Sequence, residues 1–292
     1  MNTNTDTGRQ SPVTAPDIQA RKGVDDKICC ITAYDYPSAM IADSAGVDIV
    51  LVGDSLAMVV LGHRDTLSVT VDEMVHHTLA ASRGVSRALL VADMPFMSYG
   101  TVERAMETAH SLMGRGRARA VKLEGGTAVV PQIRALTEAG IPVMGHVGLT
   151  PQHVARFGGF KAQGKSVEAA RALIDDAQAV EEAGAFCVVL EAMPVECAQL
   201  ITEAVDIPTI GIGAGSVTDG QILVYHDVLG LFDRFVPKFV RRYADLGEAS
   251  RQALVQYCED VRRGRFPGDK NTLYMPEDQV AQVRKLKVKK KK

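Results

Sequence analysis

IVLVGDS, residues 49–55, sets the pattern from which the fold of this chain is predicted. Four branched apolar residues form a run as long as one buried strand, and glycine, aspartate and serine follow at once. Polar residues directly after such a run mark the end of a strand and the start of a loop. A run that is apolar at every position indicates a strand covered on both faces, as in a parallel sheet.

The same order of apolar run, polar or glycine residues and helical stretch recurs along the chain. Eight strands are predicted, at residues 28–32, 49–52, 88–92, 120–123, 143–145, 187–190, 209–211 and 222–225. Helices are expected near residues 37–45, 71–84, 101–114, 128–139, 166–184 and 194–204, and after Pro237. This alternation predicts an α/β fold of the (β/α)8 TIM-barrel class. An open doubly wound sheet, the main alternative, normally has fewer strands, and no GxGxxG motif follows the first strand.

The length and the ends of the chain suggest three parts. A chain of 292 residues is normal for a single α/β barrel. We expect a loose leader over residues 1–23, the barrel over residues 24–275, and a basic tail over residues 276–292 that ends in KLKVKKKK. Neither end carries enough apolar residues to bury much area, so removal of residues 1–20 and 285–292 is expected to leave the fold intact.

The composition argues against several classes of protein. A net charge of −2 gives no electrostatic footprint for nucleic acid. The sequence has no apolar run long enough to span a membrane and no apolar signal core near its start. Five cysteines without a CxxC pair predict no disulfide framework, so a reducing, cytoplasmic setting is expected.

Five successive predicted strands, the second to the sixth, end in polar residues. In a barrel these ends converge on one mouth, where catalytic groups lie. A single such residue is often a helix cap, but capping does not account well for five in succession. In chain order the residues are Asp54 and Ser55, Asp93, Lys122 and Glu124, His146, and Glu191.

Two pairs among these residues predict specific contacts. Asp54 and Asp93 follow neighbouring strands, and two carboxylates repel unless a cation or a proton lies between them. Oxygen ligands favour Mg²⁺, so we expect a metal site here, with two capping aspartates as the alternative. Lys122 and Glu124 share one strand face, which would point into the barrel. A lysine there needs an anion, either a substrate oxygen or Glu124.

Three further features are less specific. Glu191 follows the strongest apolar run and is a candidate for proton transfer, with capping of the next helix as the alternative. His146 lies at a strand end, where a lone histidine is as often structural as functional. GIGAG, residues 211–215, can cradle a phosphate, but such a turn also suits close packing.

Nine short motifs, kept in order over roughly residues 25–270, resemble a known family. They are GDS at 53–55, ADMPF at 92–96, VKLEGG at 121–126, GHVGLTPQ at 145–152, FGGFKAQGK at 157–165, LEAMP at 190–194, GIGAG at 211–215, DGQILVYHDVLG at 219–230 and PKFV at 237–240. Together they resemble the ketopantoate hydroxymethyltransferases. The resemblance implies a (β/α)8 barrel of the phosphoenolpyruvate/pyruvate type, assembled as a homodecamer.

The resemblance also implies a reaction and a set of site residues. The family transfers a hydroxymethyl group from 5,10-methylenetetrahydrofolate to 3-methyl-2-oxobutanoate, which gives 2-dehydropantoate for pantothenate and coenzyme A synthesis. Glu191 matches the proton-transfer residue of the family. The residues placed at Mg²⁺ are Asp54, Asp93 and, in the outer neighbourhood of the metal, Glu124. The residues placed on the 2-oxo acid are Ser55, Asp54, Asp93 and Lys122.

A Mg-stabilised enolate gives this reaction a physical basis. The C3 hydrogen of a 2-oxo acid is weakly acidic, and Mg²⁺ on the carboxylate and the 2-oxo oxygen stabilises the enolate. A base removes the proton, and the enolate attacks the methylene carried by folate. No covalent nucleophile is required, which agrees with the lack of a Ser or Cys triad pattern. The resemblance implies three kinds of partner: a small 2-oxo acid, a folate and other copies of the chain.

Two other functions stay open. A 2-oxo acid lyase or mutase of the same barrel superfamily would share the metal carboxylates, but such enzymes usually carry a catalytic cysteine in a KKCGH-type loop, and this sequence has none. A barrel that binds 2-oxo acids without catalysis is the other possibility. The combination of Asp54, Asp93, Lys122 and Glu191 argues against it.

Overall fold

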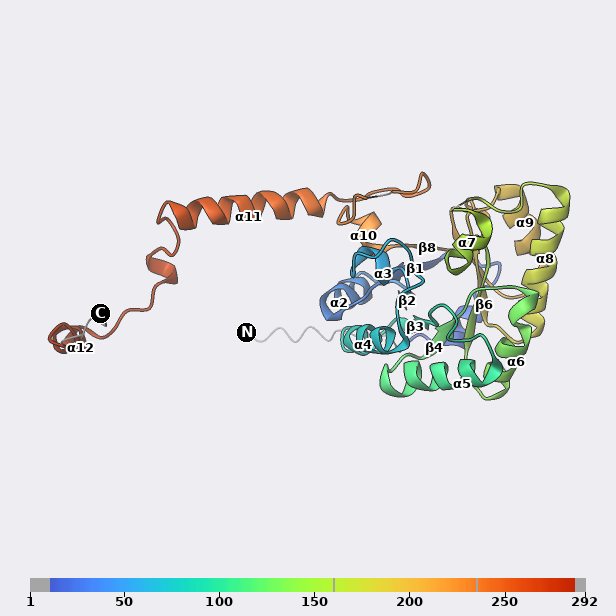
Figure 1. The fold of residues 1–292 in the computed structure, drawn as a ribbon, viewed down its shortest axis with the longest axis horizontal. Helices are drawn as coiled ribbons and strands as arrows, with labels where there is room; N and C mark the ends of the chain where they lie inside the picture. The colour runs from blue at the N-terminus through green and yellow to red at the C-terminus, as the bar shows by residue number, and fades with distance from the viewer. Residues whose placement is uncertain (1–10, 160, 235, 287–292) are drawn as a thin grey trace, which may run out of the picture. The chain divides into compact units, whose positions relative to one another are not determined.

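The chain folds around a closed parallel barrel. A computed structural model describes residues 11–159, 161–234 and 236–286. Eight parallel strands follow one another in sequence order, and the last pairs with the first (Figure 1). The strands are β1 Ile28–Thr32, β2 Ile49–Val52, β3 Leu89–Asp93, β4 Ala120–Lys122, β5 Val143–Gly148, β6 Cys187–Glu191, β7 Thr209–Ile212 and β8 Gly220–Leu223. The closed barrel confirms the predicted fold class and excludes an open sheet.

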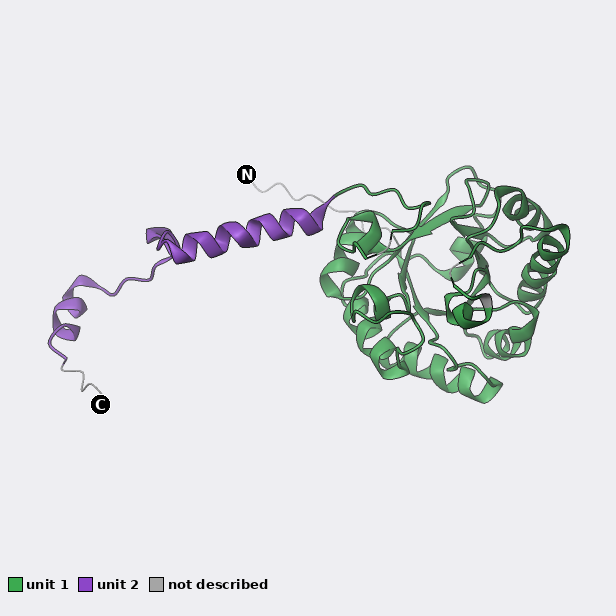
Figure 2. Cartoon of the chain, turned by 45° about the horizontal axis from the view of Figure 1, so that its top comes forward, with its two compact units in different colours: residues 1–244 green, residues 245–292 purple. Residues whose placement is uncertain are grey.

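Helices form the outer layer of this barrel (Figure 2). They are α2 Tyr36–Ser44, α3 Leu56–Val59, α4 Val71–Ser82, α5 Val102–His110, α6 Val130–Glu138, α7 Val154–Phe157, α8 Val167–Glu182, α9 Val195–Ala204 and α10 Tyr225–Val228. Short 3-10 turns span Thr127–Val129 and Pro151–His153. The helix predicted over residues 101–114 is α5 followed by a π-helical turn at Ser111–Arg115. Strand β5 runs three residues beyond its predicted end at Gly145.

Strand alternation divides the apolar core into two parts. One set of side chains packs between the strands and the helices, as Val50 and Leu90 do. The other set fills the barrel interior and includes Leu51, Val91 and Val189. All positions of β2 and β3 are buried, as expected of parallel strands that are covered on both faces.

The N-terminal segment is not the loose leader that was expected over residues 1–23. Helix α1, Ala15–Gln19, begins with a capping box and buries Ile18 completely. Ile18 belongs to the cluster that fills the barrel interior. After the helix, the Arg21 guanidinium lies 2.9 Å from the carboxylate of Asp48, which directly precedes β2. This segment therefore covers the N-terminal end of the barrel.

The apolar residues near the start are few, but one of them is placed where it fills the barrel. Against the expectation from sequence, the buried Ile18 predicts that removal of residues 11–20 destabilises the fold. Residues 1–10 lie outside the described part of the chain.

The C-terminal end also differs from the expected boundary. The compact unit that holds the barrel ends at Ala244, and residues 245–292 form a second unit. That unit contains α11 Leu246–Arg262, a 3-10 turn Asp269–Asn271 and α12 Glu277–Val283, and α11 buries none of its residues. The expected barrel domain of residues 24–275 is thus too long at this end. Most of the lysine-rich tail, residues 287–292, lies outside the described residues.

Among the described residues, no helix is long and apolar enough to cross a membrane.

Candidate active site

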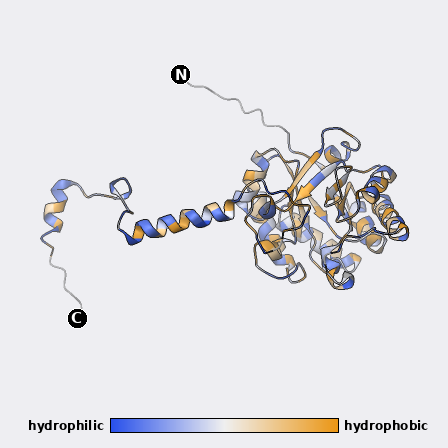
Figure 3. Ribbon diagram, turned by 90° about the horizontal axis from the view of Figure 1, so that it is seen from above, coloured by the Kyte–Doolittle hydropathy of each residue, from blue (hydrophilic) through white to orange (hydrophobic). Residues whose placement is uncertain are grey.

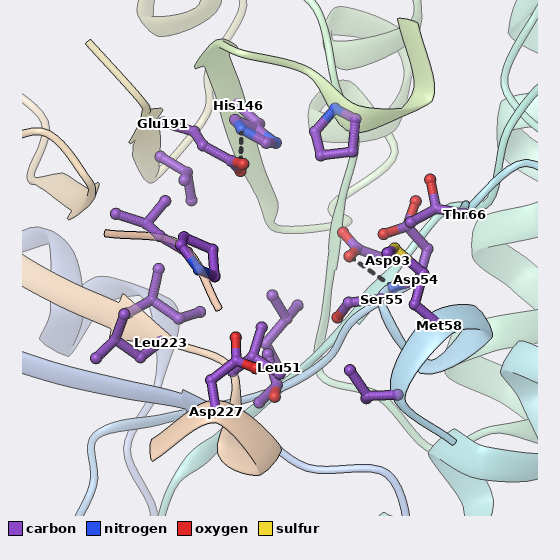
Figure 4. A pocket seen from close by; sticks show the side chains of 18 of the residues that line it. Leu51, Asp54, Ser55, Met58, Thr66, Asp93, His146, Glu191, Leu223 and Asp227 are labelled. Carbon is purple, nitrogen blue, oxygen red and sulfur yellow. Dashed lines mark hydrogen bonds and ion pairs between the residues drawn. The ribbon is translucent and has the colours of Figure 1, made fainter. Parts of the chain in front are cut away.

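The polar residues at the strand ends line one cavity at the C-terminal mouth of the barrel. In β3 to β6 they continue the inward-facing side of each strand, two residues after an apolar residue of the interior. The empty space in and above the cavity, including the open solvent at its mouth, is about 1050 Å³. Its polar lining includes Asp54, Ser55, Asp93, Lys122, Glu124, His146 and Glu191 (Figure 4). The structure thus brings together every residue that the sequence placed at the mouth.

Asp54, Asp93 and Lys122 form the buried centre of this site. The Lys122 ammonium lies 2.5 Å from Asp93 Oδ1, and the backbone N–H of Asp54 donates to Asp93 Oδ2 at 3.0 Å. Asp54 is 5% exposed, Asp93 2% and Lys122 5%. The close anionic partner of Lys122 is therefore Asp93, where the sequence suggested a substrate oxygen or Glu124.

Burial and like charge perturb the titration of this centre. Burial and the charge of Asp93 raise the pKa of Asp54 to about 7, against the opposing effects of Lys122 and Gln152. Burial and the charge of Asp54 also raise the pKa of Glu124. Burial acts to lower the pKa of Lys122, but the three carboxylates outweigh it and raise that pKa. Lys122 is accordingly a permanent cation in a strongly negative site.

The donor set fits a hard divalent cation. When ionised, the carboxylates of Asp54, Asp93 and Glu124 would carry three negative charges against one positive charge on Lys122, which a divalent cation would balance. Carboxylate oxygens are the ligands that Mg²⁺ prefers, and it usually keeps waters and substrate oxygens beside one or two carboxylates. Among the described residues, no group of three or more His, Cys, Asp or Glu side chains is arranged to hold a metal ion, so the protein ligands would be the two carboxylates of Asp54 and Asp93.

Glu191 and His146 face each other on the opposite wall of the cavity (Figure 4). His146 Nε2 lies 3.2 Å from Glu191 Oε2, and Nδ1 lies 3.7 Å from Glu124 Oε1. Among the described residues, neither ring nitrogen has a well-aligned hydrogen bond. Burial and the charge of Lys122 lower the pKa of His146, so the ring is neutral near pH 7. His146 thus belongs to the site beside Glu191.

Gln152 is a site residue that the sequence analysis did not single out. Its side-chain N–H groups donate to Asp54 Oδ2 at 2.9 Å and to the Met94 carbonyl at 3.0 Å. The Tyr99 hydroxyl donates to its Oε1 at 2.6 Å, and its backbone N–H donates to Glu124 Oε2 at 3.0 Å. Gln152 therefore holds two of the buried carboxylates in place. Its only sequence signal was its place at the end of the GHVGLTPQ motif.

The remaining wall of the cavity is mainly apolar and comes from β8 and the residues after it. It includes Leu223, Val224, Phe232, Phe239 and Val240. One carboxylate, Asp227 of α10, also lies on this wall (Figure 4). Asp227 belongs to the DGQILVYHDVLG motif, and no role was predicted for it from sequence.

The GIGAG turn packs against this wall. Gly213 has a φ of +65°, and a Cβ there would lie 2.6 Å from the Phe239 ring. Only glycine allows this close approach, so close packing accounts for the glycine at position 213.

Known proteins match both the sequence and the fold. The family model of ketopantoate hydroxymethyltransferase matches residues 12–269. The 3-methyl-2-oxobutanoate hydroxymethyltransferase of Syntrophobacter fumaroxidans is 57% identical, over 95% of this chain and 99% of that protein. The enzyme of the same name from Moorella thermoacetica is 55% identical, over 90% of this chain and 98% of that protein.

Two solved structures share the fold at low sequence identity. Phosphoenolpyruvate phosphomutase from Streptomyces platensis subsp. rosaceus has a TM-score of 0.58 and 16% identity, over 93% of this chain and 95% of that one. A 2,3-dimethylmalate lyase of the PEP mutase/isocitrate lyase superfamily has a TM-score of 0.57 and 19% identity, over 94% of each chain. These structures support the barrel type. From the sequence relatives, the chain belongs to the ketopantoate hydroxymethyltransferase family and is a transferase of that family.

Proposed function

We propose that this cavity transfers a hydroxymethyl group from 5,10-methylenetetrahydrofolate to 3-methyl-2-oxobutanoate, giving 2-dehydropantoate, with Mg²⁺ as cofactor. The observation that carries the proposal is the meeting of Asp54, Asp93, Lys122 and Glu191 in one cavity of a family member. This arrangement combines a cation site, a fixed positive charge and an accessible carboxylate. Those are the groups that formation of an enolate and its attack on a one-carbon donor require.

The residues on the Asp54 side bind the acid. Asp54 and Asp93 would hold Mg²⁺, with Glu124 in its outer neighbourhood. When bound, Mg²⁺ supplies positive charge to the carboxylate and the 2-oxo oxygen of the substrate, which lowers the energy of the enolate. Lys122 adds a second positive charge to that side, and the Ser55 hydroxyl, 2.9 Å from the Tyr34 hydroxyl, offers a hydrogen bond to the acid.

Glu191 is the proposed base for the C3 proton. Its side chain is 16% exposed, more than Glu124 or Asp93, so it is open to a substrate in the cavity. His146 stands beside it as a neutral ring and limits where the carboxylate can turn. Glu191 lies across the cavity from Asp54 and Asp93 (Figure 4). This placement suits a substrate that is bound between them.

Product formation tests the proposed function. Purified protein would be incubated with 3-methyl-2-oxobutanoate and Mg²⁺, with and without 5,10-methylenetetrahydrofolate, and the products analysed by mass spectrometry. The proposal requires 2-dehydropantoate when folate is present and an unchanged acid when it is absent. Cleavage of the acid without folate would instead support a lyase, and the absence of any turnover would support a binding protein.

We also propose that the chain assembles with other copies, as a homodecamer. Leu254, Tyr257 and Val261 lie on one face of α11 because they are spaced by three and four residues. Leu254 is 63% and Tyr257 53% exposed. Figure 3 shows such hydrophobic positions among hydrophilic ones along the helix. An uncovered apolar stripe on a long helix is typical of a surface that pairs with another subunit.

We place the protein in the cytoplasm. The five cysteines of the chain are free, and free thiols are usual in a reducing compartment. A fluorescent fusion in the source cells would test this location, and a signal confined to the cell envelope would contradict it.

A further inference from the structure

Asp227 is a buried carboxylate with unsatisfied hydrogen-bonding capacity in the wall of the cavity. It is 7% exposed, and its Oδ1 has no hydrogen-bond partner among the described residues. Nearly all buried polar groups in proteins are hydrogen-bonded, so an unpartnered carboxylate oxygen calls for an explanation. In Figure 4 the Asp227 side chain points from α10 into the cavity and lies across it from the Glu191–His146 pair.

The surroundings of Asp227 do not compensate its charge. Burial raises its pKa to about 6, against the opposing charge of Arg242. The Arg242 guanidinium, however, donates to the Phe232 carbonyl at 3.1 Å. This carboxylate is ionised at pH 8, and its buried Oδ1 has no donor among the described residues. The missing donors would be supplied by a ligand.

The neighbouring surface indicates the shape of that ligand. The side chains of Leu223, Phe232 and Phe239 also line the cavity, and Met58 lies across it from Leu223 (Figure 4). Apolar walls with one carboxylate suit a flat ring that is apolar on its faces and carries N–H donors along one edge. A five-carbon acid bound at Asp54 and Asp93 would leave the part of the cavity lined by Asp227 unfilled, because Asp227 lies apart from the two aspartates (Figure 4). The space beside Asp227 is therefore available to the second substrate.

We propose that Asp227 binds the pterin end of the folate donor and accepts hydrogen bonds from its 2-amino group and its N3–H. These two donors lie side by side on one edge of the ring, and two parallel N–H donors match the two oxygens of a carboxylate. The inference rests on the proposed function for the identity of the donor. It adds a subsite that lies apart from the residues that bind the acid.

A cycle of protein and ligand changes tests the contact directly. Binding of tetrahydrofolate and of its 2-desamino analogue would be measured by calorimetry, at about pH 8, on the full-length wild-type protein, on Asp227→Asn and on Asp233→Asn. Asn keeps the size of the side chain but presents one donor and no charge. Asp233 is exposed and does not line the cavity, so Asp233→Asn is a matched control for the loss of one negative charge.

The expected result is a coupled loss. Asp227→Asn should weaken tetrahydrofolate binding by about 10- to 100-fold, since hydrogen bonds to a charged group are lost. Removal of the 2-amino group should weaken binding by about tenfold in wild type and in Asp233→Asn, but little further in Asp227→Asn. Equal losses in all three proteins would overturn the proposal. So would tetrahydrofolate affinity in Asp227→Asn equal to that of wild type.

Two further measurements allow the proposal to be tested even if the variant fails to fold or affects the acid site. If Asp227→Asn does not fold, as judged by its thermal transition, the wild-type comparison of the two ligands still decides: equal affinities would overturn the proposal. Exchange of the C3 hydrogen of 3-methyl-2-oxobutanoate, without folate, separates the two substrates. A fall in exchange in Asp227→Asn as large as the fall in folate affinity would place the residue in the acid site and overturn the inference. Failure of the proposed function would appear instead as no exchange and no product in wild type, while the binding cycle would remain readable.

Discussion

At the scale of single residues, the site depends on carboxylates that the barrel buries, although removal of a charged carboxylate from water costs free energy. Asp54, Asp93 and Glu124 are held close together with one lysine. Such an arrangement is unfavourable in the empty protein and favourable once a divalent cation and an acid are bound. The cost is offset by hydrogen bonds from Gln152 to Asp54 and Glu124, which fix the direction of both carboxylates.

The metal ligands make the first prediction. Asp54→Asn and Asp93→Asn should each weaken Mg²⁺ binding by at least about tenfold, because each removes a charged oxygen ligand. Calorimetric titration of Mg²⁺ into protein freed of metal by a chelator measures this loss. Glu182→Gln, on the exposed side of α8, serves as a control for the loss of one charge. Wild-type affinity in either aspartate variant would show that the residue is not a ligand.

The pH dependence of stability makes the second prediction. Burial and Asp93 raise the pKa of Asp54 from about 3.8 in an unfolded chain to about 7 in the fold. Between these values the native state binds a proton that the unfolded state lacks, so this group stabilises the metal-free fold as pH falls from about 7 to about 4. Above pH 7 that contribution is absent.

Thermal unfolding in the presence of a chelator measures this contribution. The midpoint of wild type, relative to that of Asp54→Asn, should rise between about pH 8 and about pH 5, because the variant has no group to protonate there. The difference should amount to a few degrees, since one buried group of this kind contributes on the order of a few kcal/mol. Parallel pH profiles for the two proteins would show that Asp54 is ionised normally.

At the scale of elements, the strands were predictable and the ends of the chain were not. The apolar runs at residues 49–52 and 187–190 indicated β2 and β6 because buried parallel strands need apolar side chains on both faces. The polar residues that follow these runs gave the mouth of the barrel. Helix α1 escaped prediction because a five-residue helix with one large apolar side chain, Ile18, has no periodicity to detect.

Parts of the site were unpredictable for a related reason. Gln152 acts through a contact with Asp54, far away in the sequence, and Asp227 only lines the cavity once the chain is folded, so neither residue has a spacing that reveals its place. The carboxylates could be predicted from sequence because several of them occupy the same place, just after the end of a strand. Residues that reach the cavity from loops and short helices are identified only in the folded structure.

The packing of α1 makes the third prediction. Ile18→Ala should lower the free energy of unfolding by about 2–5 kcal/mol, because it removes a fully buried side chain from the barrel interior. Gln19→Ala, at the next and exposed position, should change it by less than about 0.5 kcal/mol. Denaturant unfolding at one temperature measures both variants. If Ile18→Ala is as stable as Gln19→Ala, the helix does not close the barrel.

At the scale of the whole molecule, the barrel and the C-terminal unit differ in how they can be stable. The barrel has its own apolar interior and a second layer of core under its helices. Helix α11 buries none of its residues within this chain, although Leu254 and Tyr257 are large and apolar. A helix with so little burial is stabilised mainly by what covers it in an assembly.

Assembly makes the fourth prediction. The full chain should have the mass of a homodecamer in native mass spectrometry or in light scattering. Leu254→Glu with Tyr257→Glu should reduce that mass, because two charges would lie on the apolar stripe of α11. Gln252→Glu and Gln256→Glu, at exposed polar positions of the same helix, add the same charge and should leave the mass unchanged. A full-chain mass equal to one subunit would contradict the proposed assembly.

The central claim is that Glu191 removes the C3 proton of an acid bound at the metal site across the cavity. Hydrogen exchange tests this claim most directly. Exchange of the C3 hydrogen of 3-methyl-2-oxobutanoate for deuterium, with Mg²⁺ and without folate, can be followed by NMR in wild type and in Glu191→Gln. The account predicts that the variant binds Mg²⁺ and the acid almost normally but exchanges about 10²- to 10⁴-fold more slowly, because an amide cannot accept the proton. Exchange at the wild-type rate in Glu191→Gln would contradict it.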